Sequence, residues 1–280
     1  MKHILSVNVD EVGKNIPEIV PFLKRNSIKY LELRTIDEKN LANFQPDDLQ
    51  LLKQQITKYG FHISALASPL FKWYVQKPDT IQPYDSFNFP CILSRNDKIK
   101  AINRVINYAE VLCSPKVRVF TGLSNDNPRI EQILEDDTFE YCLNLGEQKG
   151  VRILVENEPV CNVCTLNDVY ILLSKFKKLN LWLDIANFYQ IGEKFNLQNL
   201  EEFLPRIQHV HLKDIVFRDG HIQYVPLGDG AIPWEEFLYF FFEKSEHEIS
   251  FSIETHVAEN RIAATEKSIR FYRRIEKVFV

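Results

Sequence analysis

The sequence predicts a single-domain α/β protein, a (β/α)8 barrel of the TIM type over residues 1–280. Short apolar segments rich in β-branched residues alternate with helical periods along the chain. Eight such units within 280 residues match the usual size of this barrel. No stretch is rich enough in Pro, Gly or Ser to be a linker. Regular alternation requires a parallel sheet with right-handed crossovers.

The eight strand-like segments are short and apolar, as expected for strands buried in a parallel sheet. They are residues 3–9, 28–34, 61–67, 116–120, 151–156, 180–184, 207–212 and 249–254. In the last one, alternate residues separate an apolar face from a polar face that ends in Glu254. The apolar faces should pack on helices, so the acidic residues should point into the barrel.

Helical periods fill the intervening segments. Clear ones span residues 16–23, 49–56, 99–109 and 169–176, and weaker ones span 129–149, 187–203, 234–245 and 258–277. Gly60 is expected to end the second helix, and Thr165 with Asp168 forms a capping box before the fourth clear one. Pro21 predicts a kink or an early break in the first helix.

A doubly wound open sheet is the rival fold. It is disfavoured because the turn after the first strand, residues 10–13, lacks the glycine-rich fingerprint of a dinucleotide site. In a barrel, the active site is expected at the C-terminal ends of the strands.

The composition of the chain argues against a nucleic-acid-binding protein and a membrane-spanning protein. Lys and Arg number 34 and Asp and Glu 38, a net charge of −4, and no basic run suggests a nucleic-acid partner. The longest apolar run, residues 237–242, is too short to span a membrane.

The N-terminus has no secretory pattern, and five irregularly spaced cysteines suggest reduced thiols, so we expect a cytoplasmic protein. The same apolar run exceeds what one helix face needs, which points to a homodimer interface.

Acidic or imidazole side chains end the last four predicted strands: Glu156, Asp184, His211 and Glu254. Singly, such a residue is more often a helix cap or an ion-pair partner. Three carboxylates and one imidazole at matching depth would disturb each other's ionisation unless a cation lay among them. This donor set suits Mn²⁺, Mg²⁺ or Co²⁺ and is compatible with Zn²⁺. The sequence therefore predicts one divalent metal site.

Five motifs occur in a characteristic order. They are Val-Glu156-Asn-Glu, Leu-Asp184-Ile-Ala-Asn187, His209-Val-His211-Leu-Lys213-Asp214, Pro226-Leu-Gly-Asp229-Gly230 and Ile-Glu254-Thr-His256. In these motifs the chain resembles the xylose isomerase-like TIM barrel superfamily, which includes sugar phosphate isomerases and epimerases. The resemblance covers essentially the whole chain.

The resemblance implies that Glu156, Asp184, His211 and Glu254 are the metal ligands, with His211 rather than His209 because it directly precedes the Leu-x-Asp step. It also implies that Glu156 and Glu254 are the acid and base of an isomerase or epimerase. Such an enzyme acts on a sugar, polyol or sugar phosphate through a metal-stabilised enediolate.

Further substrate-binding candidates surround these ligands. Many relatives carry His where this chain has Asn187, which can still bond a substrate hydroxyl. Glu158 lies two residues after Glu156, on the same side of the strand, and either contacts substrate or lies exposed. Lys213 either contacts substrate or pairs with an acid. The remaining candidates are Lys72 and Trp73, which either cover a sugar or plug the barrel mouth, and Arg218.

Three alternative functions remain at this point. A metal-dependent dehydratase or lyase needs the same metal and acids. A catalytically degenerate barrel that only binds a sugar is suggested by Asn187. A nuclease similar to endonuclease IV is disfavoured, because it needs extra histidines on early strands and segment 116–120 has none.

Overall fold

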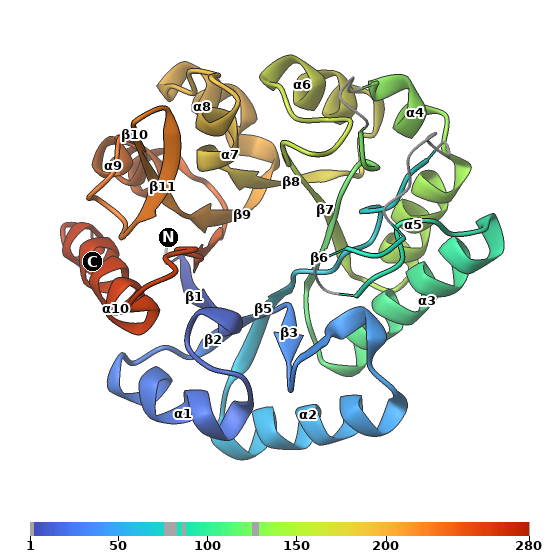
Figure 1. Ribbon diagram of the computed structural model, residues 1–280, viewed down its shortest axis with the longest axis horizontal. Helices are drawn as coiled ribbons and strands as arrows, with labels where there is room; N and C mark the ends of the chain where they lie inside the picture. The colour runs from blue at the N-terminus through green and yellow to red at the C-terminus, as the bar shows by residue number, and fades with distance from the viewer. Residues whose placement is uncertain (1–2, 76–82, 86–87, 125–128, 280) are drawn as a thin grey trace.

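A computed structural model describes residues 3–75, 83–85, 88–124 and 129–279. Eight parallel strands close into a barrel in the order β1-β12-β9-β8-β7-β6-β5-β2 (Figure 1). Their bounds are β1 Ile4–Asn8, β2 Tyr30–Leu33, β5 His62–Leu66, β6 Lys116–Val119, β7 Arg152–Glu156, β8 Asn180–Asp184, β9 Ile207–Leu212 and β12 Ser250–Ile253. All eight predicted strands are present, and the (β/α)8 prediction is confirmed.

Helices form a ring around the strands (Figure 1). They are α1 Ile16–Arg25, α2 Pro46–Tyr59, α3 Arg95–Val111, α4 Ile130–Leu134, α5 Asp137–Gln148, α6 Leu166–Lys175, α7 Ile185–Gln190, α8 Leu197–Phe203, α9 Trp234–Lys244 and α10 Arg261–Glu276. Short 3₁₀ turns lie at Val9–Glu11, Leu41–Asn43 and Leu204–Arg206. None of the described helices combines the length and apolar character that a membrane crossing requires.

Three helical predictions need correction. Segments 129–149 and 187–203 each contain two helices, α4 with α5 and α7 with α8. Asp136 and Asn196 cap the second helix of each pair, accepting bonds from Thr138 and Asn199 backbone N–H groups. The early break at Pro21 does not occur, because α1 continues to Arg25.

Two antiparallel hairpins absent from the sequence prediction extend from the C-terminal ends of strands. One joins β3 (Thr35–Ile36) to β4 (Lys39–Asn40) after β2, and the other joins β10 (Asp214–Arg218) to β11 (His221–Val225) after β9. Both lie at the end of the barrel where the strand-end acids are found.

The pleat of β12 separates two environments, as its alternation predicts. Phe251 faces outward and packs on Phe241 of α9 and Tyr272 of α10. Ser250 faces inward, where its hydroxyl lies 2.6 Å from Nδ1 of His209. The barrel interior is therefore polar next to this strand, and the apolar core lies between strands and helices.

The apolar run 237–242 lies in α9. Phe237 and Phe241 are buried, while Phe240 and Phe242 are partly buried against the core. Tyr239 is the most exposed member, with 36% of its surface accessible. The run thus serves mainly the core of the barrel.

The N-terminal cap of helix α6 should contribute measurably to the stability of the protein. Thr165 Oγ1 accepts a bond from the Asp168 N–H, and Asp168 in return accepts from the Thr165 N–H. We expect Thr165→Ala to lower the free energy of unfolding by about 1 kcal/mol. Urea denaturation should show this loss, whereas Thr57→Ala, at an exposed interior position of α2, should leave stability nearly unchanged. Equal effects of the two changes would contradict the capping argument.

Candidate metal centre

The four candidate ligands converge at the C-terminal end of the barrel. Glu156 and Asp184 end β7 and β8, His211 lies in β9, and Glu254 follows β12, so the four come from adjacent strands. Nδ1 of His211 lies 3.1 Å from Glu156 Oε1, 3.5 Å from Asp184 Oδ2 and 3.0 Å from Glu254 Oε2. All four residues are at most 2% exposed.

The cluster offers donor atoms that suit a cation. Among the described residues, Nδ1 of His211 and Oδ2 of Asp184 are buried outside ordinary hydrogen-bond geometry, although Oδ2 of Asp184 is in ion-pair contact with Lys213. Atoms bound about 2.1 Å from one cation lie roughly 3.0 to 3.4 Å apart at common coordination angles. Glu156, Asp184 and His211 each offer a donor atom within 4.8 Å of the other two, which resembles part of such a shell, and Glu254 adjoins this group through its contact with Nδ1 of His211. One nitrogen and three carboxylate groups are suitable donors for a divalent ion.

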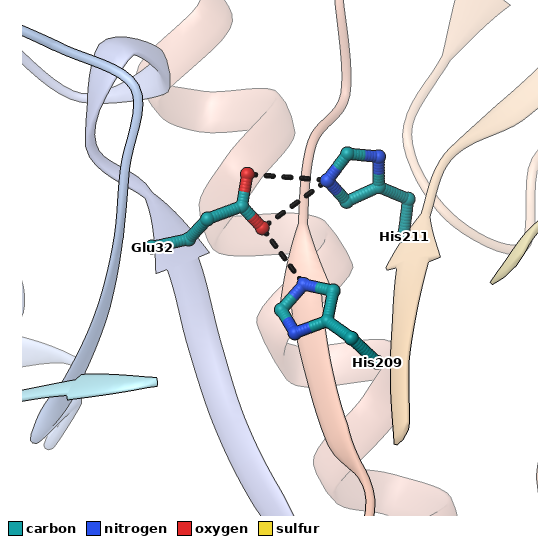
Figure 2. A group of neighbouring side chains, drawn as sticks. All are labelled: Glu32, His209 and His211. Carbon is teal, nitrogen blue, oxygen red and sulfur yellow. Dashed lines mark hydrogen bonds and ion pairs between the residues drawn. The ribbon is translucent and has the colours of Figure 1, made fainter. Parts of the chain in front are cut away.

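Glu32 of β2 fixes the orientation of the His211 ring (Figure 2). Nε2 of His211 lies 3.1 Å from both carboxylate oxygens of Glu32. An N–H at Nε2 leaves the Nδ1 lone pair directed at the three acids, which is the usual arrangement of a metal-binding histidine. Burial raises the pKa of Glu32, but His211 and His209 outweigh burial and hold the pKa well below its ordinary value.

His209 also contacts Glu32, through Nε2 at 2.9 Å (Figure 2). Burial lowers the pKa of His209 to about 4, so its ring is neutral at pH 7. A neutral ring that donates from Nε2 accepts at Nδ1, where the Ser250 hydroxyl lies. Glu32, His209 and His211 therefore form a hydrogen-bonded group that supports the adjoining cluster of acids.

Without a cation, His211 supplies the positive charge at the centre. Burial lowers its pKa, but Glu254, Glu32 and Glu156 outweigh burial and raise the pKa well above its ordinary value. The imidazolium thus compensates the buried carboxylates. A divalent ion would take over this compensation and displace the Nδ1 proton.

Two arginines that the sequence prediction did not include hold the outer carboxylates. Arg118 donates from Nη1 to Glu156 Oε2 at 2.9 Å, and its ring neighbours are Phe120 and Trp182. Arg34 donates from Nη1 to Glu254 Oε1 at 2.7 Å. Each glutamate therefore turns one oxygen to a guanidinium and the other to His211. The signal that could have found them is strand parity, since Arg118 lies two residues after Lys116 in β6 and Arg34 lies two residues after Glu32, just beyond the end of β2.

These charges also set the ionisation of the two glutamates. Burial raises the pKa of Glu156, but Arg118 and His211 outweigh burial and lower the pKa below its ordinary value. Burial likewise raises the pKa of Glu254, but His211, His256 and the neighbouring cations hold it well below its ordinary value. Both glutamates are ionised at neutral pH.

Asp184 connects the cluster to its surroundings. Its Oδ1 caps α7 by accepting from the Asn187 N–H, while its Oδ2 lies 2.5 Å from Nζ of Lys213. The Asn157 amide bonds both backbone groups of Asp184, which joins the ends of β7 and β8. Lys213 also lies 3.4 Å from Glu254. Lys213 is thus paired with acids, and it also lines the cavity beside them.

A cavity of about 260 Å³ opens above the cluster. Its charged lining comes from Arg34, Lys72, Asp85, Arg118, Glu156, Glu158, Lys213 and Glu254, with His256 at the rim. Lys72 and Glu158 form an ion pair of 2.9 Å across it. Asn187 is buried beside Glu158, to which its amide donates at 3.3 Å.

Trp73 and Arg218, like Asn187, do not line this cavity. Trp73 is fully buried and packs against Phe71 and Phe89, which agrees with the plug interpretation. Arg218 is exposed at the end of the β10–β11 hairpin, where it pairs with His221 in the ladder. The hairpin carries Arg218 away from the acids, a displacement that strand parity alone does not reveal.

Comparisons with known proteins agree with this architecture. A search of curated proteins finds no match. Among solved structures, the IOLI protein with a bound zinc atom is 20% identical with a TM-score of 0.72, covering 99% of this chain and 98% of its own. The 3-keto-D-glucoside 4-epimerase YcjR of E. coli is 17% identical with a TM-score of 0.71, covering 98% and 100%. The probable 3-DHS dehydratase AsbF of Bacillus anthracis is 17% identical with a TM-score of 0.71, covering 98% and 99%.

At these identities the solved structures establish the fold. The family model named xylose isomerase-like TIM barrel matches residues 21–275, which include every candidate ligand. The chain belongs to the xylose isomerase-like TIM barrel family.

Proposed function

We propose that this protein is a divalent-metal-dependent isomerase or epimerase of a sugar, polyol or sugar phosphate, with Glu156 and Glu254 as its acid and base. One observation carries the proposal: three buried carboxylates surround Nδ1 of His211 at 3.0 to 3.5 Å. Glu156, Asp184, His211 and Glu254 would hold the ion, which would polarise a substrate carbonyl and acidify the adjacent C–H.

The chain's own residues supply the proton transfers. Glu156 and Glu254 come from the two outer strands of the four-strand set, so they border the cluster on both sides. Both are ionised, so either accepts a proton from a substrate carbon. Because Arg118 and Arg34 lower their proton affinity, a captured proton is readily returned.

The cavity above the cluster is suited to a small polar substrate. Its volume of about 260 Å³ and its charged lining favour a hydroxylated molecule over an apolar one. Lys72 and Glu158 offer a donor and an acceptor at its rim. An epimerase that acts on a keto-glucoside, and that shares the fold, is consistent with this class of substrate.

The first test is elemental analysis of the purified protein, followed by incubation with ketoses and ketose phosphates in deuterated water. We expect one divalent ion per chain and metal-dependent entry of deuterium at the carbon next to the carbonyl. If no ion binds after addition of Mn²⁺, Mg²⁺, Co²⁺ and Zn²⁺, the proposal is wrong.

A dehydratase is the second candidate, favoured by the similarity to the probable dehydratase AsbF. Removal of the same proton followed by loss of a β-hydroxyl requires the same metal and acids. NMR of the products separates the two reactions, because an alkene or enone indicates elimination and an inverted stereocentre indicates epimerisation.

Glu32 provides a test of the ligand assignment. Replacing Glu32 by Gln removes the carboxylate that orients His211, and we expect metal affinity to fall about 10- to 100-fold. Titration of the metal-free protein with Mn²⁺ or Zn²⁺ measures this. Glu38→Gln is the control, since Glu38 forms an exposed ion pair with Lys14 and should not alter affinity. Unchanged affinity in the Glu32 variant would argue against His211 as a ligand.

A further inference from the structure

A second cavity, of about 590 Å³, opens at the opposite end of the barrel, where the strands begin. Its lining includes the first residues of five strands: Ile4, Tyr30, His62, Lys116 and Arg152. Lys53 also lines it, and Glu248 is its one acidic residue among the described part of the chain. The candidate metal centre shares no lining residue with this cavity.

Lys116 is buried without a counterion. It is 2% exposed, and its ammonium donates to the Gln208 carbonyl at 2.8 Å and to the Ser250 hydroxyl at 2.9 Å. No carboxylate in the described ranges lies within ion-pair distance of it. Burial, with help from Arg152, lowers its pKa to about 7, and the charge of Glu248 offsets this only in part.

Arg152 stands beside Lys116, since the two residues are partners in the β6–β7 register. Its side chain is exposed to the cavity and donates from Nη1 to the Gln208 side-chain oxygen at 2.5 Å. Like Lys116, it has no carboxylate partner among the residues described. Two cations that lack an ion-pair partner among the described residues thus adjoin one another at a cavity large enough for a small metabolite, with Glu248 as the acid on its lining.

We propose that this cavity binds a small molecule through a phosphate group held by Lys116 and Arg152. A dianion there would compensate both cations and replace the repulsion between them with attraction. The guanidinium fork pairs with two phosphate oxygens, and an ammonium suits a third as a point charge. This site is independent of the proposed reaction, because it lies at the other end of the barrel.

Isothermal titration of the purified protein with inorganic phosphate tests the proposal. We expect one phosphate per chain, and at least about tenfold weaker binding in Lys116→Met and Arg152→Met. Lys177→Met, which removes an exposed lysine after α6, should bind like the original chain. Because Arg152 is exposed, its variant should fold even if the buried Lys116 change destabilises the protein.

A further variant decides between the two ends of the barrel. Lys72 lines the cavity above the acids, so Lys72→Met should leave phosphate binding unchanged. The proposal is overturned if binding is lost with Lys72 and kept in both variants at Lys116 and Arg152. It is also overturned if the original chain shows no binding at millimolar phosphate.

Discussion

Replacing Glu254 by Gln should lower kcat by about 10²- to 10⁴-fold, because an amide cannot take up and return a proton. Glu254 is 2% exposed and lies 3.0 Å from Nδ1 of His211. Gln has nearly the same shape, and its oxygen can still accept from Arg34 and Asn8, which now bond Oε1. The measurement is the rate of deuterium entry into the substrate found by screening, at several metal concentrations.

The metal dependence separates the two roles of Glu254. If excess metal restores bound metal but not the rate, Glu254 acts as acid or base. If it restores both, Glu254 acts mainly as a ligand. Glu248→Gln is the matched control, since this exposed acid precedes the same strand at the opposite end of the barrel. A Glu254 variant with the original rate would contradict the proposed mechanism.

Replacing Asp214 by Ala should destabilise the protein by at least about 3 kcal/mol. The Asp214 carboxylate accepts bonds from the backbone N–H groups of Ile215, Gly228, Gly230 and Ile232. Its removal leaves several of these donors buried without an acceptor. A Cβ at Gly230 would lie 1.9 Å from Asp214 Oδ1, which explains why this close approach requires glycine.

Thermal and urea unfolding of the Asp214 variant measure this loss. Asp229→Ala is the control in the same loop, because Asp229 is exposed and pairs with Lys267 on the surface. Exposed ion pairs contribute about 0 to 1 kcal/mol, so this control should remain nearly as stable as the original chain. Similar stability of the two variants would show that the four bonds to Asp214 contribute little.

The regular parts of the fold could be predicted because they follow from local patterns. Each barrel strand is apolar and short, and the alternation in β12 correctly placed Ser250 inside and Phe251 outside. The motif Leu-Lys213-Asp214 could be recognised in the sequence, but the different roles of Lys213 and Asp214 could not. Lys213 pairs with Asp184, whereas Asp214 anchors the loop after β11.

The parts that could not be predicted depend on contacts distant in sequence. Glu32 reaches His211 across the barrel, and Arg118 reaches Glu156 from the neighbouring strand. The alternation of residues along a strand shows only that such a side chain points into the barrel. Its partner depends on how far along the barrel axis it lies and on which strands are neighbours. The β10–β11 hairpin could not be predicted either. It places Arg218 outside the cavity, although a residue that follows β9 so closely was expected to line it.

Pairing of β1 with β12 closes the barrel, and this seam determines when the candidate centre forms during folding. The two strands pair from Ile4 with Ser250 to Val7 with Ile253, and beyond them the Asn8 amide donates to Glu254, 246 positions away. Contacts of such long range form late, because the intervening chain must first be ordered. A ligand held by Glu254 therefore binds only the closed barrel, so it should slow the opening of the seam without hastening its closure.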